Sequence, residues 1–266
     1  MEYIKRFNIN FIESLGKVVL TNIKAMGKFS SYIGTLFYWG MRSPYRHKLL
    51  WEQIYFIGNK SLFIIILTSS FSGMVFAYQT YIGFSVINAD SFIGPIVAIS
   101  VAKELAPVFT GLVVAGRCGA AMAAQIGTMK VTEQIDALEC MGINSVQYLG
   151  VPRVLACMIS MPLLAAIFIL IANIGSWVIG VKLLLIDDVL YFSKLSDFMR
   201  MGMVYEGLVK SFVFGFLISV IGTYQGFQVK GGAEGVGKGT NLAVVWGMVM
   251  VLVVDFFLTS ILTKIL

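Results

Sequence analysis

The chain has 266 residues, of which 58% are hydrophobic and 13% charged, and its mean hydropathy is +0.85. This composition excludes an ordinary water-soluble domain, because most of the surface must then face lipid. The net charge of +6 would suit a nucleic-acid partner in a soluble protein, but no basic patch interleaved with aromatic residues supports one. We therefore predict an all-α polytopic membrane protein, with a single domain over residues 1–266.

The first segment predicts an amphipathic helix that lies in the membrane interface. Apolar residues recur at spacings of three and four between residues 8 and 28, and polar residues form the opposite face. A helix packed on a soluble partner is the alternative. The aromatic stretch 32–41, "YIGTLFYWGM", is too short to cross a bilayer, which takes about 20 residues. Residues 8–41 are thus expected to form an interfacial or elbow region.

Five long apolar segments follow, and each is long enough to cross a bilayer as a helix. These spans are expected at about 61–87, 92–116, 154–181, 211–229 and 243–263. Fourteen of the 20 Lys and Arg residues fall in 1–60, 117–153 and 230–242, whereas five fall in the segments on the other side. The bias of basic residues toward the cytoplasm then predicts a cytoplasmic N-terminus and a C-terminus on the opposite side.

Three charged residues lie inside predicted spans: Lys103, Glu104 and Asp255. An ionised group there costs at least about 2.5–3.5 kcal/mol, so such residues usually face a cavity, a partner helix or each other. Pro107 removes a backbone donor close to the first two, which predicts a local break in the second span. Two readings remain open, a polar cavity and a structural Lys–acid pair between helices.

Two tyrosines near the outer end of the first span, Tyr78 and Tyr81, are candidates for the lining of the same cavity. Aromatic side chains also anchor helices at the membrane interface, and this explanation fits them equally well.

A short acidic helix is predicted between the second and third spans, at about 128–142. Glu133, Asp136 and Glu139 follow one face at intervals of three. Ile135 and Leu138 belong to an apolar face, and such a two-faced helix is suited to docking in a groove of a partner. The alternative, a helix lying flat on the membrane, is less compatible with three acids beside an anionic surface.

The segment 230–241, "KGGAEGVGKGTN", partly matches a phosphate-binding loop. Such a loop needs Ser or Thr after its Lys and follows a buried strand, whereas here Gly239 follows Lys238 and the preceding segment is a membrane span. We expect a tight cytoplasmic turn with close backbone approaches instead. Its candidate residues are Gly231, Gly232, Gly235, Gly237 and Lys238.

Two long motifs resemble one known family. Residues 103–156, "KELAPVFTGLVVAGRCGAAMAAQIGTMKVTEQIDALECMGINSVQYLGVPRVLA", are similar to the signature region of the MlaE permease family, the membrane subunits of MCE-type ABC lipid transporters. Residues 226–245, "GFQVKGGAEGVGKGTNLAVV", resemble the second signature of that family. One departure is Ala106, where the family commonly has Gly.

The resemblance implies a homodimeric permease in the bacterial inner membrane. The expected partners are a cytoplasmic ABC ATPase, a periplasmic MCE-domain protein and phospholipid moving between the inner and outer membranes. It also implies a coupling helix at about 128–142 and an outward-facing lipid pocket that includes Glu104. No cofactor is expected in this chain, since ATP and Mg²⁺ would be bound by the partner ATPase.

Two other classes of function are alternatives to a lipid permease. An ion-gradient-driven secondary transporter or channel would use Lys103, Glu104 and Asp255 as ion sites, but such folds commonly have internal repeats, and none is obvious here. An intramembrane enzyme would need a nucleophile and base in a defined arrangement, and no such pair is apparent. The chain is therefore not expected to be an enzyme, and any ATP hydrolysis is expected in a separate subunit.

Overall fold

A computed structural model describes the backbone of residues 2–43, 46–86 and 89–265, and it contains helices and no strand in these ranges. The chain divides into two compact units, residues 1–45 and 46–266. The first contains one helix, α1 (Glu2–Gly40). Many side chains of the amphipathic segment predicted at 8–28 lie outside those that the structure describes.

The second unit contains five helical segments that are long and apolar enough to cross a membrane. These segments are His47–Ser85, Asp90–Val131, Val146–Leu183, Met201–Gln228 and Gly232–Leu262. The chain is thus an all-α polytopic membrane protein. Most of these helices extend well beyond the predicted spans, because hydropathy marks the apolar centre of a helix, whereas backbone hydrogen bonding continues into its polar ends.

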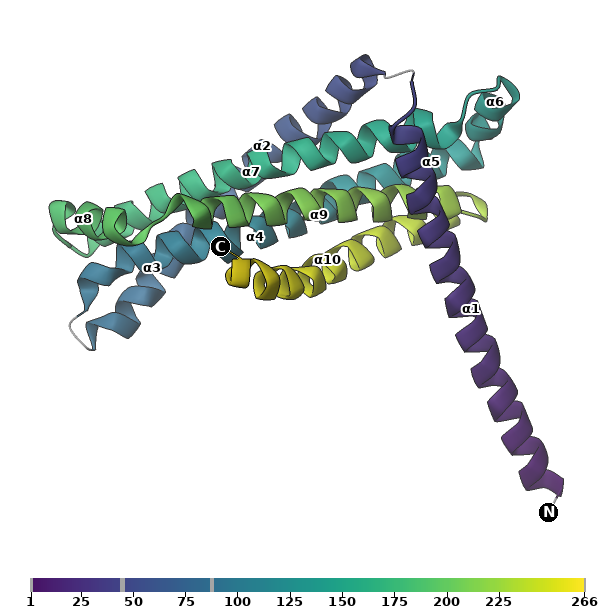
Figure 1. The fold of residues 1–266 in the computed structure, drawn as a ribbon, viewed down its shortest axis with the longest axis horizontal. Coiled ribbons are helices and arrows are strands. Elements are labelled where there is room, and N and C mark those ends of the chain that lie inside the picture. Colours follow the sequence, from purple (N-terminus) through teal and green to yellow (C-terminus); the bar gives the residue numbers. More distant parts are fainter. Residues whose placement is uncertain (1, 44–45, 87–88, 266) are drawn as a thin grey trace. The chain divides into compact units, whose positions relative to one another are not determined.

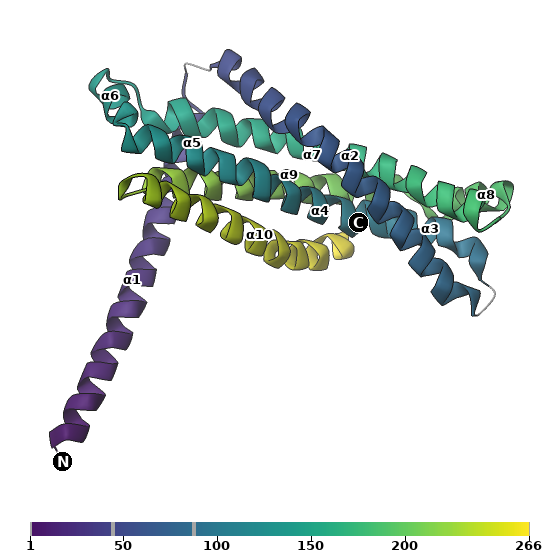
Figure 2. The same ribbon diagram turned by 180° about the vertical axis from the view of Figure 1, so that it is seen from behind.

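The first, fourth and fifth of these segments are continuous helices: α2 (His47–Ser85), α9 (Met201–Gln228) and α10 (Gly232–Ile265). Figures 1 and 2 show α7 (Val151–Trp177) and α9 running side by side, with α10 along α9. The buried core is formed where α2, α7 and α9 meet the second segment, and it includes Ile65, Phe168 and Phe214.

The second and third segments contain π-helical turns. The second consists of α3 (Ile93–Ser100), α4 (Ala106–Val114) and α5 (Ala120–Val131), preceded by the short turn Asp90–Phe92. Two π turns join its helices: η2 (Val101–Leu105) and η3 (Ala115–Gly119). The third has π turns at its two ends, η4 (Val146–Gly150) and η5 (Val178–Leu183). Short π turns inside α-helices frequently mark functional sites.

Two short helices lie at opposite ends of this bundle (Figures 1 and 2). One is α6 (Gln134–Cys140), in the connection between the second and third segments, and the other is α8 (Asp188–Phe198), between the third and fourth. Asp187 caps α8 by accepting a hydrogen bond from the backbone N–H of Leu190 at 2.8 Å. The bundle thus has two distinct ends, each with its own surface.

Candidate functional site

The candidate site begins at the π turn η2, which carries Lys103 and Glu104. Pro107 follows it and has no N–H to donate to the carbonyl four residues earlier, that of Lys103. This carbonyl instead accepts a hydrogen bond from Nζ of Lys210 at 3.0 Å. The predicted break in the second span therefore takes the form of a π turn whose backbone is bonded by a side chain of another helix.

A close approach of α9 makes this contact possible. A Cβ atom on Gly207 would overlap the backbone carbonyl of Ala102, so only glycine allows α9 to lie this close to η2. Glu206 and Lys210 flank that glycine on α9 at a spacing of four, and both are buried, at 2% and 0% exposure. The two side chains therefore meet the π turn from the same side of α9.

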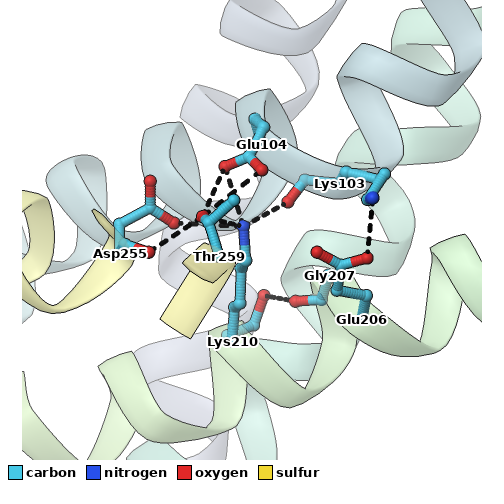
Figure 3. A network of polar contacts seen from close by, with 8 residues as sticks. Lys103, Glu104, Glu206, Gly207, Lys210, Asp255 and Thr259 are labelled. Carbon is cyan, nitrogen blue, oxygen red and sulfur yellow. Dashed lines mark hydrogen bonds and ion pairs between the residues drawn. The ribbon is translucent and has the colours of Figure 1, made fainter. Parts of the chain in front are cut away.

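Lys210 is the centre of the polar network in Figure 3. Its ammonium donates to Oε2 of Glu104 at 2.7 Å and to the hydroxyl of Thr259 at 2.8 Å. The nearer carboxylate oxygen of Asp255 lies 3.4 Å away, close enough for an ion pair but too far for a strong hydrogen bond. A fully buried ammonium is thereby stabilised by two carboxylates and two neutral oxygens, including the Lys103 carbonyl described above.

A second ion pair joins the same two helical segments. Nζ of Lys103 lies 3.0 Å from Oε2 of Glu206, whose other oxygen is buried and has no hydrogen-bond partner among the described residues. Two adjacent residues of η2 therefore form ion pairs of opposite polarity with α9. The base Lys103 pairs with an acid, and the acid Glu104 pairs with a base. The five ionisable groups carry one more negative than positive charge when all are ionised.

The network is buried on the α9 side and accessible on the side of η2. The side chain of Glu104 is 39% exposed and that of Lys103 is 23% exposed, whereas Lys210 is inaccessible. Lys103, Glu104 and Asp255 thus lie in one network, which contains interhelical ion pairs and also presents charge at its edge. Tyr78 is 48% exposed and Tyr81 packs against the apolar core, and neither belongs to the network drawn in Figure 3.

Three members of the network were not singled out from the sequence: Glu206, Lys210 and Thr259. Hydropathy predicts that the fourth span begins near residue 211 and places Lys210 and Glu206 in an outside loop, whereas α9 begins at Met201. The available signal was the spacing of the two residues, because an acid and a base four apart at the edge of a span share a helical face. Nothing in the sequence around Thr259 distinguishes it from any other hydroxyl residue in a membrane helix.

At the α6 end of the bundle, the helix predicted at 128–142 is divided. α5 ends at Val131 and α6 begins at Gln134, and Glu133 between them has a positive φ of 58°. Ile135 and Leu138, expected to face a partner, pack against Ile126 and Leu149 of the same chain. The apolar face is therefore largely occupied within the chain.

The three acids of this segment differ in their surroundings. Glu133, Asp136 and Glu139 are all exposed, and Glu139 also accepts a hydrogen bond from the Ser145 hydroxyl at 2.9 Å. The surface available to a partner is thus acidic, with the exposed Met141 beside it, at 65% exposure.

The glycine segment is mostly helical rather than a loop. The turn is confined to the residues just before α10 and to its first residue, and Gly231 and Gly232 have φ values of 86° and 71°. A Cβ on Gly235 would overlap the Lys230 carbonyl, so the two backbones lie close together there, whereas a Cβ on Gly237 would meet no atom within 4 Å. Lys238 forms an exposed ion pair with Glu234 at 2.7 Å, one helical turn earlier.

This arrangement suits the binding of polar or charged groups at the edge of η2 rather than covalent chemistry. Among the described residues, no three His, Cys, Asp or Glu side chains are grouped so that they could hold a metal ion. The combination of five membrane-crossing helices with a charged, partly accessible break in the second segment is that of a membrane permease.

Comparisons with known proteins identify the family. The family described as "Permease MlaE" matches residues 50–261. The chain is 39% identical over 257 residues to a probable ABC transporter permease protein of Rickettsia bellii, covering 97% of this chain and 99% of the relative. It is 34% identical over 256 residues to the intermembrane phospholipid transport system permease protein MlaE of Haemophilus influenzae, covering 95% and 97%.

A plant relative matches over a shorter region. The chloroplastic protein TRIGALACTOSYLDIACYLGLYCEROL 1 of Arabidopsis thaliana is 36% identical over 209 residues, which are 79% of this chain and 60% of that protein. This chain belongs to the MlaE permease family. It is a multi-pass ABC transporter permease and not an enzyme.

Proposed function

We propose that this permease moves phospholipid between the inner and outer membranes of a bacterium, driven by a separate ATPase. The observation that carries the proposal is the match, over nearly the whole chain, to the relative named as an intermembrane phospholipid transport permease. The partly accessible Glu104 supports it, because a charged group at the edge of an apolar bundle can bind a lipid headgroup while the acyl chains stay in apolar surroundings.

In the proposed assembly, two copies of the chain form a homodimer with a lipid pocket at their interface. Glu104 and Lys103 contribute the charged part of the pocket, and Lys210, which also pairs with Asp255, holds Glu104 in place. Tyr78 extends the pocket along α2, where it is exposed, and Tyr81 supports it from the core.

A cytoplasmic ABC ATPase binds ATP and Mg²⁺ and docks at the α6 end of the bundle, in this proposal. The acids Glu133 and Asp136 are exposed there and available to basic residues of a partner. Ile135 and Leu138 transmit movement of the ATPase to the bundle, because they connect α6 to the apolar cluster formed by α5 and η4. A periplasmic MCE-domain protein receives or supplies lipid at the α8 end.

The proposed orientation follows from the Lys and Arg bias and this assembly. The protein lies in the inner membrane with its N-terminus in the cytoplasm and its C-terminus in the periplasm. The α6 end is then cytoplasmic and the α8 end periplasmic, which is consistent with docking of the ATPase and of the MCE-domain protein on opposite ends (Figure 1).

The test is reconstitution of the tagged chain with the proteins that co-purify in mild detergent. We expect an ABC ATPase and an MCE-domain protein among them, and transfer of labelled phospholipid that requires ATP and Mg²⁺. Replacing Glu104 with Leu should lower lipid occupancy and transfer, because the headgroup loses its charged contact. Transfer driven by an ion gradient without any ATPase would support instead the secondary transporter, which the buried charge network also permits.

A further inference from the structure

An apolar groove lies at the α8 end of the bundle. It has a volume of about 960 Å³ and is lined by α7, α8 and the first residues of α9. This volume is at the upper end of the range of small-molecule sites, about 300–1,000 Å³. None of the five charged residues of the network lines the groove.

The groove follows one face of α7. Its lining residues on that helix run from Ala166 to Trp177 at helical spacing, and Leu170 and Ile174 among them are 64% and 56% exposed. At 1.5 Å per residue this stretch is roughly 16 Å long. That is about half of the roughly 30 Å hydrocarbon thickness of a bilayer, so the groove matches the depth of a single leaflet.

Polar side chains along the groove are bonded within the chain. The Tyr191 hydroxyl lies 3.1 Å from that of Ser176, and the Ser196 hydroxyl donates to the Ser193 carbonyl. The amide of Asn173 donates to the carbonyl of Ile169 at 2.8 Å. The interior of the groove therefore presents mainly hydrocarbon to a ligand.

Arg200 is the charged residue that lines the groove. It is exposed, and no carboxylate among the described residues lies within ion-pair distance of its guanidinium. The nearby acids Asp187 and Asp188 already accept hydrogen bonds, Asp187 from the N–H of Leu190 and Asp188 from the Trp177 indole. Asp197 is the acid of α8 without such a contact.

The start of α9 adds to this positive potential. Arg200 directly precedes the helix and provides no side-chain cap, and no acid occupies the first turn. The N–H of Met203 donates to the Arg200 carbonyl at 3.0 Å, and the N–H groups of Met201 and Gly202 before it favour an anion at this place.

We propose that the groove binds one phospholipid of the leaflet at the α8 end. One acyl chain lies along α7, and the phosphate is held by Arg200 at the start of α9. An apolar groove one leaflet deep, ending at a guanidinium without a carboxylate partner, matches the two parts of such a lipid. Arginine suits the phosphate because its planar donors bind two oxygens at once.

The experiment is photolabelling of the full chain, in its purified assembly, in nanodiscs. The probe is phosphatidylglycerol with a diazirine in one acyl chain, and the comparison is diacylglycerol with the same chain. We expect phosphatidylglycerol to label peptides of α7 and α8 that line the groove, well above the lipid-facing surface around Leu163, which is 59% exposed and lies outside it. Diacylglycerol should label the groove weakly.

Arg200→Gln should reduce the labelling by roughly tenfold, because it removes a charge-assisted bond to the phosphate. Lys194→Gln is the matched control, since Lys194 is on α8 but lies over the Phe92 ring, 5.4 Å from its centroid, and does not line the groove. Ala166→Trp should fill the groove and exclude the acyl chain, whereas Leu163→Trp should not. Thermal unfolding of each variant in detergent checks that it is folded.

Several outcomes would overturn the proposal. Equal labelling along all of α7 would indicate ordinary annular lipid. Equal labelling by the two probes, or labelling unchanged in Arg200→Gln, would remove the phosphate contact. Protection of the groove by a cross-linked protein segment would make it a protein interface. Each outcome is independent of lipid transfer, so it leaves the proposed transport function unaffected.

Discussion

Lys210 is the residue on which the charged network depends, because it is the only cation in contact with Glu104 and Asp255 in the described part of the chain. Its four acceptors come from two other helical segments: Glu104 and the Lys103 carbonyl belong to η2, and Asp255 and Thr259 belong to α10. A buried ammonium with this many partners connects the helices. Removing it leaves two carboxylates close together without compensation.

Lys210→Met should lower the free energy of unfolding by about 3 kcal/mol, near the lower end for breaking a buried ion pair, because Glu104 keeps part of its exposure to solvent. Unfolding in mixed detergent micelles measures this value. Lys264→Met is the control, since Lys264 is exposed in the last turn of α10. Adding Asp255→Asn to Lys210→Met should restore part of the loss, and no restoration would argue against charge as its cause.

At the scale of helices, α9 determines where the charges meet. Gly207 lets α9 approach η2 so closely that Glu206 and Lys210 reach Lys103 and Glu104. The close approach and the ion pairs depend on each other, because a wider separation would lengthen both salt bridges.

We expect Gly207→Ala to destabilise the protein by about 1–3 kcal/mol, since the added methyl group overlaps a backbone carbonyl that has little freedom to move. Gly202→Ala is the matched control one and a half turns earlier on α9, where a Cβ would meet no atom within 4 Å. The measurement is the melting temperature of both variants in detergent. Equal melting temperatures would mean that α9 can shift without loss.

The other element with a defined role is α6. Glu133 adopts a left-handed conformation between α5 and α6, which is uncommon for a residue with a side chain. The break changes the direction of the chain, so α6 can place Ile135 and Leu138 against the bundle and expose Asp136.

Reversal of the two exposed acids that accept no side-chain hydrogen bond from Ser145, Glu133→Lys with Asp136→Lys, should reduce co-purification of the ATPase at least tenfold, by loss and reversal of charge complementarity. Glu52→Lys, an exposed acid on α2, is the control for altered net charge. The yield of ATPase per permease after affinity purification is the measurement. A normal yield together with normal lipid transfer would mean that the ATPase docks elsewhere.

The sequence predicts the helical class, the five spans and the break beside Pro107, because long apolar runs and a missing backbone donor are local signals. It does not predict which charges pair. Lys210 and Glu206 follow a charged segment, so hydropathy assigns them to a loop, and only the contact of α9 with η2 reveals them as core residues. Similarly, the apolar face of α6 cannot be assigned to a partner or to the chain itself without the structure.

For the whole molecule, the natural cysteines provide a test of orientation. Cys140 is exposed at the end of α6, whereas Cys118 and Cys157 are buried in the core. A maleimide that does not cross membranes should therefore react with one cysteine. In the proposed orientation it should label Cys140 in inside-out vesicles but not in intact spheroplasts.

Leu185→Cys provides the opposite control, because Leu185 is 84% exposed in the connection just before α8. Its new thiol should be labelled in spheroplasts, in a background in which Cys140 is replaced by Ser. Mass spectrometry of the labelled peptides reads both positions. Labelling of Cys140 in spheroplasts would reverse the proposed topology.

The π turns of the second segment determine the direction in which the side chains beyond them point around the helix axis. A π turn holds about one residue more than an α turn, so the side chains beyond it are rotated by about 100° from their places on an uninterrupted helix. Between α3 and α5 the phase changes twice, at η2 and at η3. Loss of a single residue in η2, even an apolar one, would turn α3 relative to α4. The meeting of Lys103 and Glu104 with α9 thus depends on the number of residues in this turn as well as on their kind.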